Sequence, residues 1–248
     1  MLKKCMAVML VIIMAMSGVS AAAETNIIFD LDISSYCNED GGGTNSRTIL
    51  KNGLIPVRHS HENGIEYINL DGRGGFTASV PSSYEELTIE MWVKLDEGET
   101  ETPLLVLYNE TETITGLNAA GNKAILLGDS QSDLNSVEWT HLALTLKQSN
   151  DTINRCLYIN GSAAAEDTAT AALSSITDMN IFAYSDKYTD GAIGKFTVYD
   201  EICDIQSLYN ADKNKFEGED TDPVYIPVLA GGDADTAPQL ISYENQMN

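Results

Sequence analysis

Four short segments between residues 87 and 209 constrain the fold of this chain more than any other feature. Three of them alternate apolar and polar residues as half-buried strands do, and the fourth joins such a strand to a short helical stretch. In chain order they are LTIEMWVKL (87–95), EWTHLALTL (138–146), NRCLYINGS (154–162) and DGAIGKFTVYDEICDIQSLY (190–209). Strands of this kind bury one face against a second sheet.

The alternation also decides which side chains face the expected core. In the first segment the apolar residues from Leu87 to Leu95 point one way, whereas Glu90 and Trp92 point the other way. In the third segment Asn160-Gly161 follows the strand directly, which is the strongest short signal for a tight hairpin turn. Clusters of Gly, Asn, Asp and Ser separate strand-like runs from residue 26 to 200, and this pattern predicts a sandwich or jelly roll.

The end of the fourth segment has the features of a short closing helix. Asp204 is a suitable N-cap, and Ile205, Leu208 and Tyr209 follow at the spacing of one helix face. We therefore expect a single helix of about two turns at the end of the sandwich.

In this order and spacing, the segments resemble the laminin G-like, concanavalin A-like jelly-roll family in its bacterial secreted form. In that family a strand close to FTIEAWVK is followed by WTHVALT, by LYVNG and by a strand that runs into IYDRALSAEEI. The matching positions are Trp92, 139–141, 157–161 and 199–208, and IIFDLD (27–32), EDGGGTN (39–45) and INLDGRGGFTASVP (68–81) are similar to the family's opening strands. The resemblance implies an all-β fold, a two-sheet antiparallel jelly-roll sandwich of the concanavalin A-like type with a short C-terminal helix.

The two ends of the chain differ from this central part. Lys3 and Lys4 precede an apolar run, and small residues close it, which predicts a signal peptide over residues 1–23; an uncleaved anchor is the alternative. We expect the jelly-roll domain over 24–212. Residues 213–248 read as an acidic linker and a tail, or as the start of a truncated further module. The predicted location is secreted, extracellular or at the cell surface, with no membrane insertion after signal cleavage.

The charge of the chain excludes some classes of partner. The formal net charge is −23, and removal of residues 1–23, which hold two lysines and no acids, makes it −25. So acidic a protein repels phosphate backbones and anionic lipid surfaces, and we expect no nucleic acid partner. After signal removal Cys37, Cys156 and Cys203 remain, an odd number from which the sequence selects no disulfide pair; we expect packed thiols.

Catalysis is not indicated by the pattern of acids. Retaining glycosidases of this architecture place acids at alternating positions of one strand, as Glu-x-Asp-x-x-Glu, whereas Glu90 stands alone among apolar neighbours. His59 and His61 could share a strand face as metal ligands, but an exposed polar edge is the simpler interpretation. We expect His141 to be a packed, hydrogen-bonded residue and the protein not to be an enzyme.

Calcium is a possible cofactor because turns rich in Asp, Asn and Gly supply the oxygen ligands that it prefers. The candidate metal ligands are Asp71 and Asp190, with Asp186, Asp129 and Asp133 in similar turns. Many laminin G-like domains bind calcium at the sandwich rim, so the resemblance also points to it. Asp-Gly pairs are ordinary turn formers as well, and that alternative stays open.

Glycan binding needs an exposed aromatic ring against the sugar's C–H face, with amides and carboxylates for its hydroxyls. Tyr184 and Tyr188 lie beside Asp186 and could form such a site, and Trp92 with Glu90 offers a second one. The alternative for Trp92 is that another element covers it in a second packed layer. The resemblance implies a secreted, non-catalytic module that binds a glycan or another cell-surface ligand. A protein–protein adhesion module and a glycoside hydrolase with atypical carboxylates are the alternatives.

Overall fold

The structure is a computed structural model. It describes residues 27–31, 33, 46–50, 58–62, 65–70, 72–80, 84–96, 98, 100–126, 130–134 and 138–217.

The first of its two large sheets has eight strands, all antiparallel to their neighbours. Seven of them follow the order β13-β12-β11-β6-β17-β4-β3, and β1 also pairs with β17. Their bounds are β1 Ile27–Asp30, β3 Arg58–Glu62, β4 Ile65–Asn69, β6 Glu86–Leu95, β11 Thr140–Ser149, β12 Thr152–Ile159, β13 Ser162–Ala169 and β17 Gly191–Tyr199. The four segments singled out in the sequence supply the centre of this sheet.

The second sheet has seven strands in the order β10-β9-β8-β7-β14-β5-β2, and a small two-stranded sheet, β15-β16, extends from it. Their bounds are β2 Ser46–Leu50, β5 Gly74–Ser79, β7 Thr102–Tyr108, β8 Thr113–Ala119, β9 Lys123–Leu126, β10 Gln131–Asp133, β14 Asp178–Ile181, β15 Ala183–Tyr184 and β16 Lys187–Tyr188. A single 3₁₀ turn, Leu173–Ser175, precedes β14.

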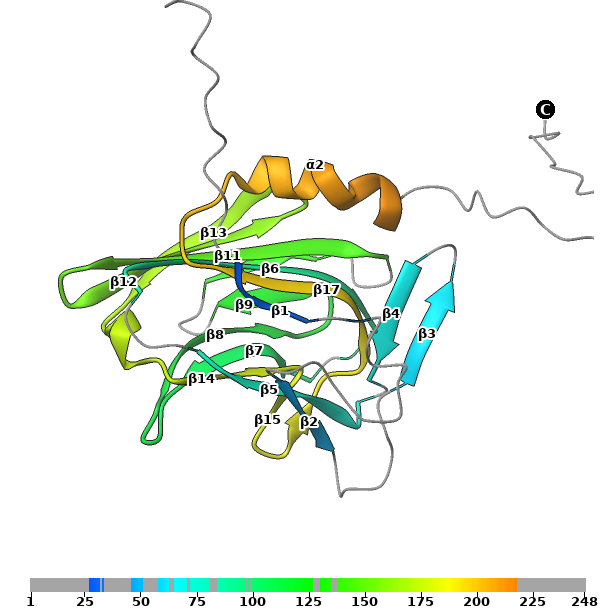
Figure 1. The fold of residues 1–248 in the computed structure, drawn as a ribbon, viewed down its shortest axis with the longest axis horizontal. Helices are drawn as coiled ribbons and strands as arrows, with labels where there is room; N and C mark the ends of the chain where they lie inside the picture. The colour runs from blue at the N-terminus through cyan, green and yellow to red at the C-terminus, as the bar shows by residue number, and fades with distance from the viewer. Residues whose placement is uncertain are drawn as a thin grey trace, which may run out of the picture.

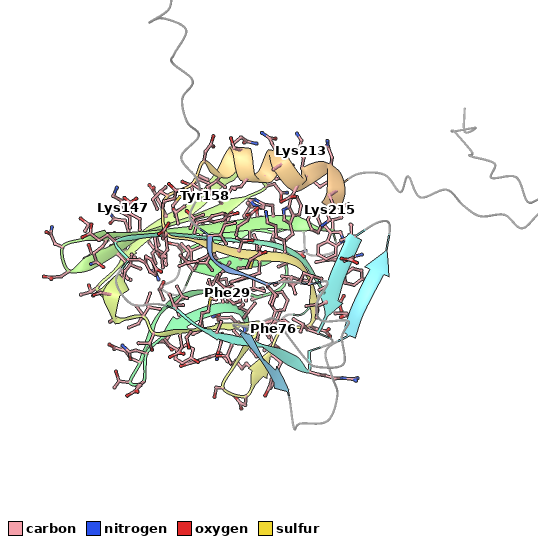
Figure 2. The ribbon with its side chains drawn as sticks, in the orientation of Figure 1. Phe29, Phe76, Lys147, Tyr158, Lys213 and Lys215 are labelled. Carbon is pink, nitrogen blue, oxygen red and sulfur yellow. The ribbon has the colours of Figure 1, made fainter. Side chains whose placement is uncertain are left out.

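The core lies between the two sheets and is formed by the apolar rows that the alternation predicts. Leu142 and Leu144 of β11 pair with Met91 and Ile89 of β6, and all four side chains are buried. Figure 2 shows Phe29 and Phe76 in the same interior, one from each sheet. Each fully buried side chain of this size contributes about 1.5–3 kcal/mol of hydrophobic free energy to the folded state.

One polar side chain links the two sheets through this interior. Arg155 of β12 donates through Nε to Asp167 at 2.6 Å and through Nη1 to Thr115 of β8 at 3.0 Å. The expected hairpin after β12 is also confirmed: Asn160 and Gly161 have φ angles of 48° and 78°, as tight hairpins require at both central positions.

Helix α2, Ile205–Phe216, closes the sandwich from outside, across the face of the first sheet that points away from the second (Figure 1). Asp204 caps it and accepts a hydrogen bond from the Ser207 backbone N–H. The helix is longer than the expected two turns and crosses the boundary expected at residue 212, because Phe216 is itself buried against the sheet.

The predicted fold, two antiparallel sheets with one C-terminal helix, is therefore confirmed. The expected signal peptide (1–23) and the part of the expected tail beyond residue 217 lie outside the described residues. Within the described part of the chain, no helix is both long and apolar enough to cross a membrane.

Candidate functional site

A groove of about 460 Å³ lies between the β15–β16 hairpin and strands β7 and β8 of the second sheet. The hairpin and the two strands each contribute lining residues, and Glu101 precedes β7. Its lining residues are Glu101, Pro103, Val106, Thr113, Asn118, Tyr184, Ser185, Asp186 and Lys187. Most of the lining residues are polar and one is aromatic, but the surface that they present to the groove is mainly apolar.

The hairpin is held in an unusual backbone conformation. Phe182 and Ser185 have φ angles of 61° and 59°, in the left-handed region that non-glycine residues seldom adopt. Phe182 is fully buried, donates its N–H to the Leu104 carbonyl at 3.0 Å and accepts from the Thr189 N–H at 2.9 Å. The Thr189 hydroxyl also donates to the Pro103 carbonyl. Strained residues of this kind persist only where the surroundings fix them, and they concentrate at functional sites.

The aromatic ring of the groove is fixed as well. The Tyr184 hydroxyl lies 2.8 Å from Thr113 Oγ1, and its ring lies 5.9 Å from that of Tyr108 at an interplanar angle of 53°. Tyr108 in turn donates to Asn180 Oδ1 at 3.1 Å. These contacts join the hairpin to three strands of the sheet, so Tyr184 loses little conformational entropy when a ligand binds.

Hydrogen-bond donors and acceptors line the same groove as this ring. Glu101 accepts from Asn118 Nδ2 at 2.5 Å, across the pairing of β7 with β8. Asp186 and Lys187 are exposed at the tip of the hairpin. Hydroxyl groups both donate and accept, and they can satisfy carboxylate, amide and ammonium partners together. The groove therefore has the chemistry for a ligand rich in hydroxyl groups.

The structure separates the predicted loop residues into two places. Tyr184 and Asp186 line the groove, but Tyr188 and Asp190 line a separate, smaller hollow of about 170 Å³. The Asp190 carbonyl accepts from the Asp96 N–H at 3.3 Å. A Cβ on Gly72 would lie 3.5 Å from that of Asp190, so the two turns are in contact.

Those predicted metal ligands that lie among the described residues do not form a cluster of three or more metal-binding side chains. Among the described residues, no three His, Cys, Asp or Glu side chains come together in a way that could hold a metal ion. Asp71 and Asp129 lie outside the described residues, and Asp133 ends β10. His59 and His61 lie on β3, opposite Ile68 and Glu66 of β4.

Trp92 and Glu90 require a correction, because the structure covers both. Their side chains are fully buried under α2, where Trp92 stacks on Phe216 at 4.5 Å and on Tyr209 at 5.9 Å between ring centroids. The second packed layer named as the alternative for Trp92 is what the structure contains. A ligand cannot reach either residue while the helix is in place.

Glu90 is the centre of a buried polar cluster. Its carboxylate accepts from His141 Nε2 at 3.2 Å, Lys195 Nζ at 3.0 Å and the Tyr199 hydroxyl at 2.8 Å. Burial acts to raise the pKa of Glu90, but these hydrogen bonds and the charge of Lys195 outweigh it, so the pKa lies below the usual value. A general acid needs the opposite shift.

The cysteines within the described residues have no visible role in either hollow. Cys156 and Cys203 are free thiols and half-buried, and burial raises the pKa of Cys203. Cys37 lies outside the described residues.

Of the residues that line the groove, the sequence predicted Tyr184 and Asp186 but not the polar residues that the strands and their connections contribute, which are Glu101, Thr113 and Asn118. Glu101 lies outside the strands, in the connection that leads directly into β7. Asn118 interrupts the apolar residues of β8, and this outward-facing amide was the one signal available.

The groove belongs to a fold that is shared with carbohydrate-binding proteins. A sequence profile of the concanavalin A-like lectin/glucanases superfamily matches residues 70–204, more than half of the chain. When the sequence of this chain is compared with those of curated proteins, none of them matches.

Solved structures show the same architecture at low sequence identity. Domain 4 of a GH43 extracellular arabinanase from Geobacillus stearothermophilus, solved with arabinotriose, is 15% identical with a TM-score of 0.56; the match covers 75% of this chain and 98% of that domain. A structure of botulinum neurotoxin type C, described as interacting with two ganglioside molecules, is 13% identical with a TM-score of 0.53, and covers 75% of this chain and 51% of its own. The receptor-binding domain of botulinum neurotoxin type G is 14% identical with a TM-score of 0.52, over 76% and 52%.

Proposed function

Because the chain belongs to the concanavalin A-like lectin/glucanase superfamily, we propose that it is a secreted, non-catalytic module that binds carbohydrate in the groove beside the β15–β16 hairpin. The observation that carries this proposal is the fixed ring of Tyr184 among hydrogen-bonding groups. A tyrosine held in place offers its face to the C–H groups of a sugar, while Glu101, Asn118 and Asp186 are within the same groove for the hydroxyls. The arabinotriose and ganglioside ligands of two structural neighbours support the same class of ligand.

Substitution of Tyr184 by alanine tests the groove. We expect loss of about 1–3 kcal/mol of binding free energy, or roughly fivefold to 150-fold in Kd, because the variant removes the aromatic ring from the groove. A glycan array would first identify the ligand, and isothermal titration calorimetry would then compare the two proteins.

Tyr158→Ala is the matched control, since Tyr158 is a half-buried tyrosine on β12 of the other sheet. This control should bind with the wild-type affinity. Binding that survives Tyr184→Ala unchanged would place the site elsewhere, and binding of a protein ligand with no bound glycan would favour the adhesion alternative.

The non-catalytic part of the proposal has its own support and test. Glu90, the acid that a glycosidase alternative would use, is inaccessible and ionised. Incubation with the polysaccharides that the protein binds should release no reducing sugars. Calcium at the rim beside Asp190 remains a separate proposal, and no part of the groove depends on it.

A further inference from the structure

The charges that line the groove favour one class of sugar over another. Glu101 and Asp186 are carboxylates, and Lys187 is the one basic residue among the lining residues within the described chain. The groove therefore carries a net negative charge, on a protein whose formal net charge is already −23.

The carboxylates also determine which groups a ligand can offer. An ionised carboxylate only accepts hydrogen bonds, and one of the two already accepts from Asn118. Sugar hydroxyls and ammonium groups can donate to such an oxygen, but the carboxylate group of a uronate, which replaces a hydroxymethyl group, and a sulfate group only accept hydrogen bonds. It also brings a like charge, which costs about 1 kcal/mol at 4 Å in bulk water and more in a partly enclosed site.

We propose that the groove selects uncharged oligosaccharides and discriminates against uronate-containing ones. The selectivity is set by Glu101 and Asp186, with Lys187 partly offsetting them. This inference rests on the proposed function, because it concerns the same groove.

The experiment measures binding to pairs of oligosaccharides that differ only in charge. Suitable probes are hexamers of β-1,4-linked glucose or mannose and the corresponding hexamers of glucuronate or mannuronate, together with an array of paired neutral and acidic glycans. At about 20 mM salt we expect the neutral member of each bound pair to bind about tenfold more tightly than the acidic one. This ratio of the neutral to the acidic affinity should decrease at about 500 mM salt, because the Debye length is then only a few Å.

Two variants assign the selectivity to the groove. Asp186→Asn should bring the two affinities closer together, whereas Lys187→Met should separate them further. Asp151→Asn is the matched control, since it removes the same charge from an exposed residue in the turn between β11 and β12 of the other sheet and should leave the ratio unchanged.

The two proposals fail in different ways. Acidic members that bind as tightly as their neutral partners, with or without a calcium chelator, would overturn the charge selectivity and leave glycan binding intact. A ratio that changes equally in Asp186→Asn and Asp151→Asn would also overturn it, because the effect would then come from the net charge of the protein. If no glycan in the array binds, the proposed function itself is wrong.

Discussion

Glu90 shows how a residue that resembles a catalytic acid can serve the fold. Its carboxylate is fully buried and has three donors, and Lys195 bridges it to Asp212 of α2 at 2.6 Å. We expect Glu90→Gln to lower the free energy of unfolding at pH 7 by about 3–5 kcal/mol, because it breaks a buried ion pair on one side only. Urea denaturation measures this. Glu86→Gln is the control, as its pair with Lys147 is largely exposed and should matter little.

The same cluster predicts a pH dependence. The pKa of Glu90 is lowered in the folded protein, so its contribution is present above the unfolded value and is lost as the pH falls through the lower folded value. The pKa of Lys195 is raised despite its burial, chiefly by the charge of Glu90, so its contribution is lost only as the pH rises through that higher value. Between pH 5 and pH 3, wild-type stability should therefore fall more steeply than that of Glu90→Gln. If the free energy of unfolding fell with pH equally steeply in the two proteins, Glu90 would not be the group responsible.

At the scale of single residues, alternation in the sequence was a good guide to facing but not to accessibility. It placed Glu90 and Trp92 on the face opposite the aliphatic row, and the structure agrees. It could not show that α2 covers that face, because the helix begins more than 100 residues later in the chain. The positive φ angles of Phe182 and Ser185 had no signal either, since neither residue type favours that conformation.

The end of helix α2 packs against the sheet at Gly194 of β17, where the missing side chain leaves room for Phe216. A Cβ on Gly194 of β17 would lie 2.4 Å from Phe216 Cε1, and 3.1 Å from Trp139 Cζ3. We expect Gly194→Ala to displace the end of the helix and to lower the free energy of unfolding by about 1–3 kcal/mol, as overpacking does. Because both tryptophans of the chain contact Phe216, their fluorescence should shift to longer wavelength.

Gly98→Ala is the matched control for this substitution, since no atom lies within 4 Å of a Cβ added there. It should leave both stability and fluorescence as they are. An unchanged emission spectrum in Gly194→Ala would mean that the helix does not depend on this contact.

The position of this helix was predictable, whereas its length was not. Asp204 marks its start correctly, because an N-cap is a local signal. Its last turn, Lys213–Phe216, reads in sequence as a charged linker. That turn is helical because Phe216 packs on Trp92, which is a tertiary contact and leaves no periodic signal.

At the scale of the whole molecule, the groove is assembled from strands that the chain order does not place together. Tyr184 and Thr113 are 71 residues apart, yet their hydroxyls are in contact because β14 pairs with β7 and carries the hairpin beside it. The sequence could predict Tyr184 and Asp186, since an exposed turn marks them. It could not predict Glu101 or Asn118, because strand order in a sandwich depends on long-range pairing rather than on local pattern.

The large negative charge predicts how salt and calcium should affect the melting temperature. Repulsion among acids destabilises the compact state, and salt screens it, so the Tm should rise by about 2–4 °C between 20 and 150 mM NaCl if screening contributes about 1 kcal/mol. The buried Glu90 cluster should contribute little to this change, because salt does not screen buried pairs well.

Calcium chloride at the same ionic strength separates screening from specific binding. If Asp190 helps to hold calcium at the rim, the Tm should rise further, and that increment should vanish in Asp190→Asn but persist in Asp151→Asn. Equal curves in the two salts would mean that calcium acts on this protein only as an electrolyte.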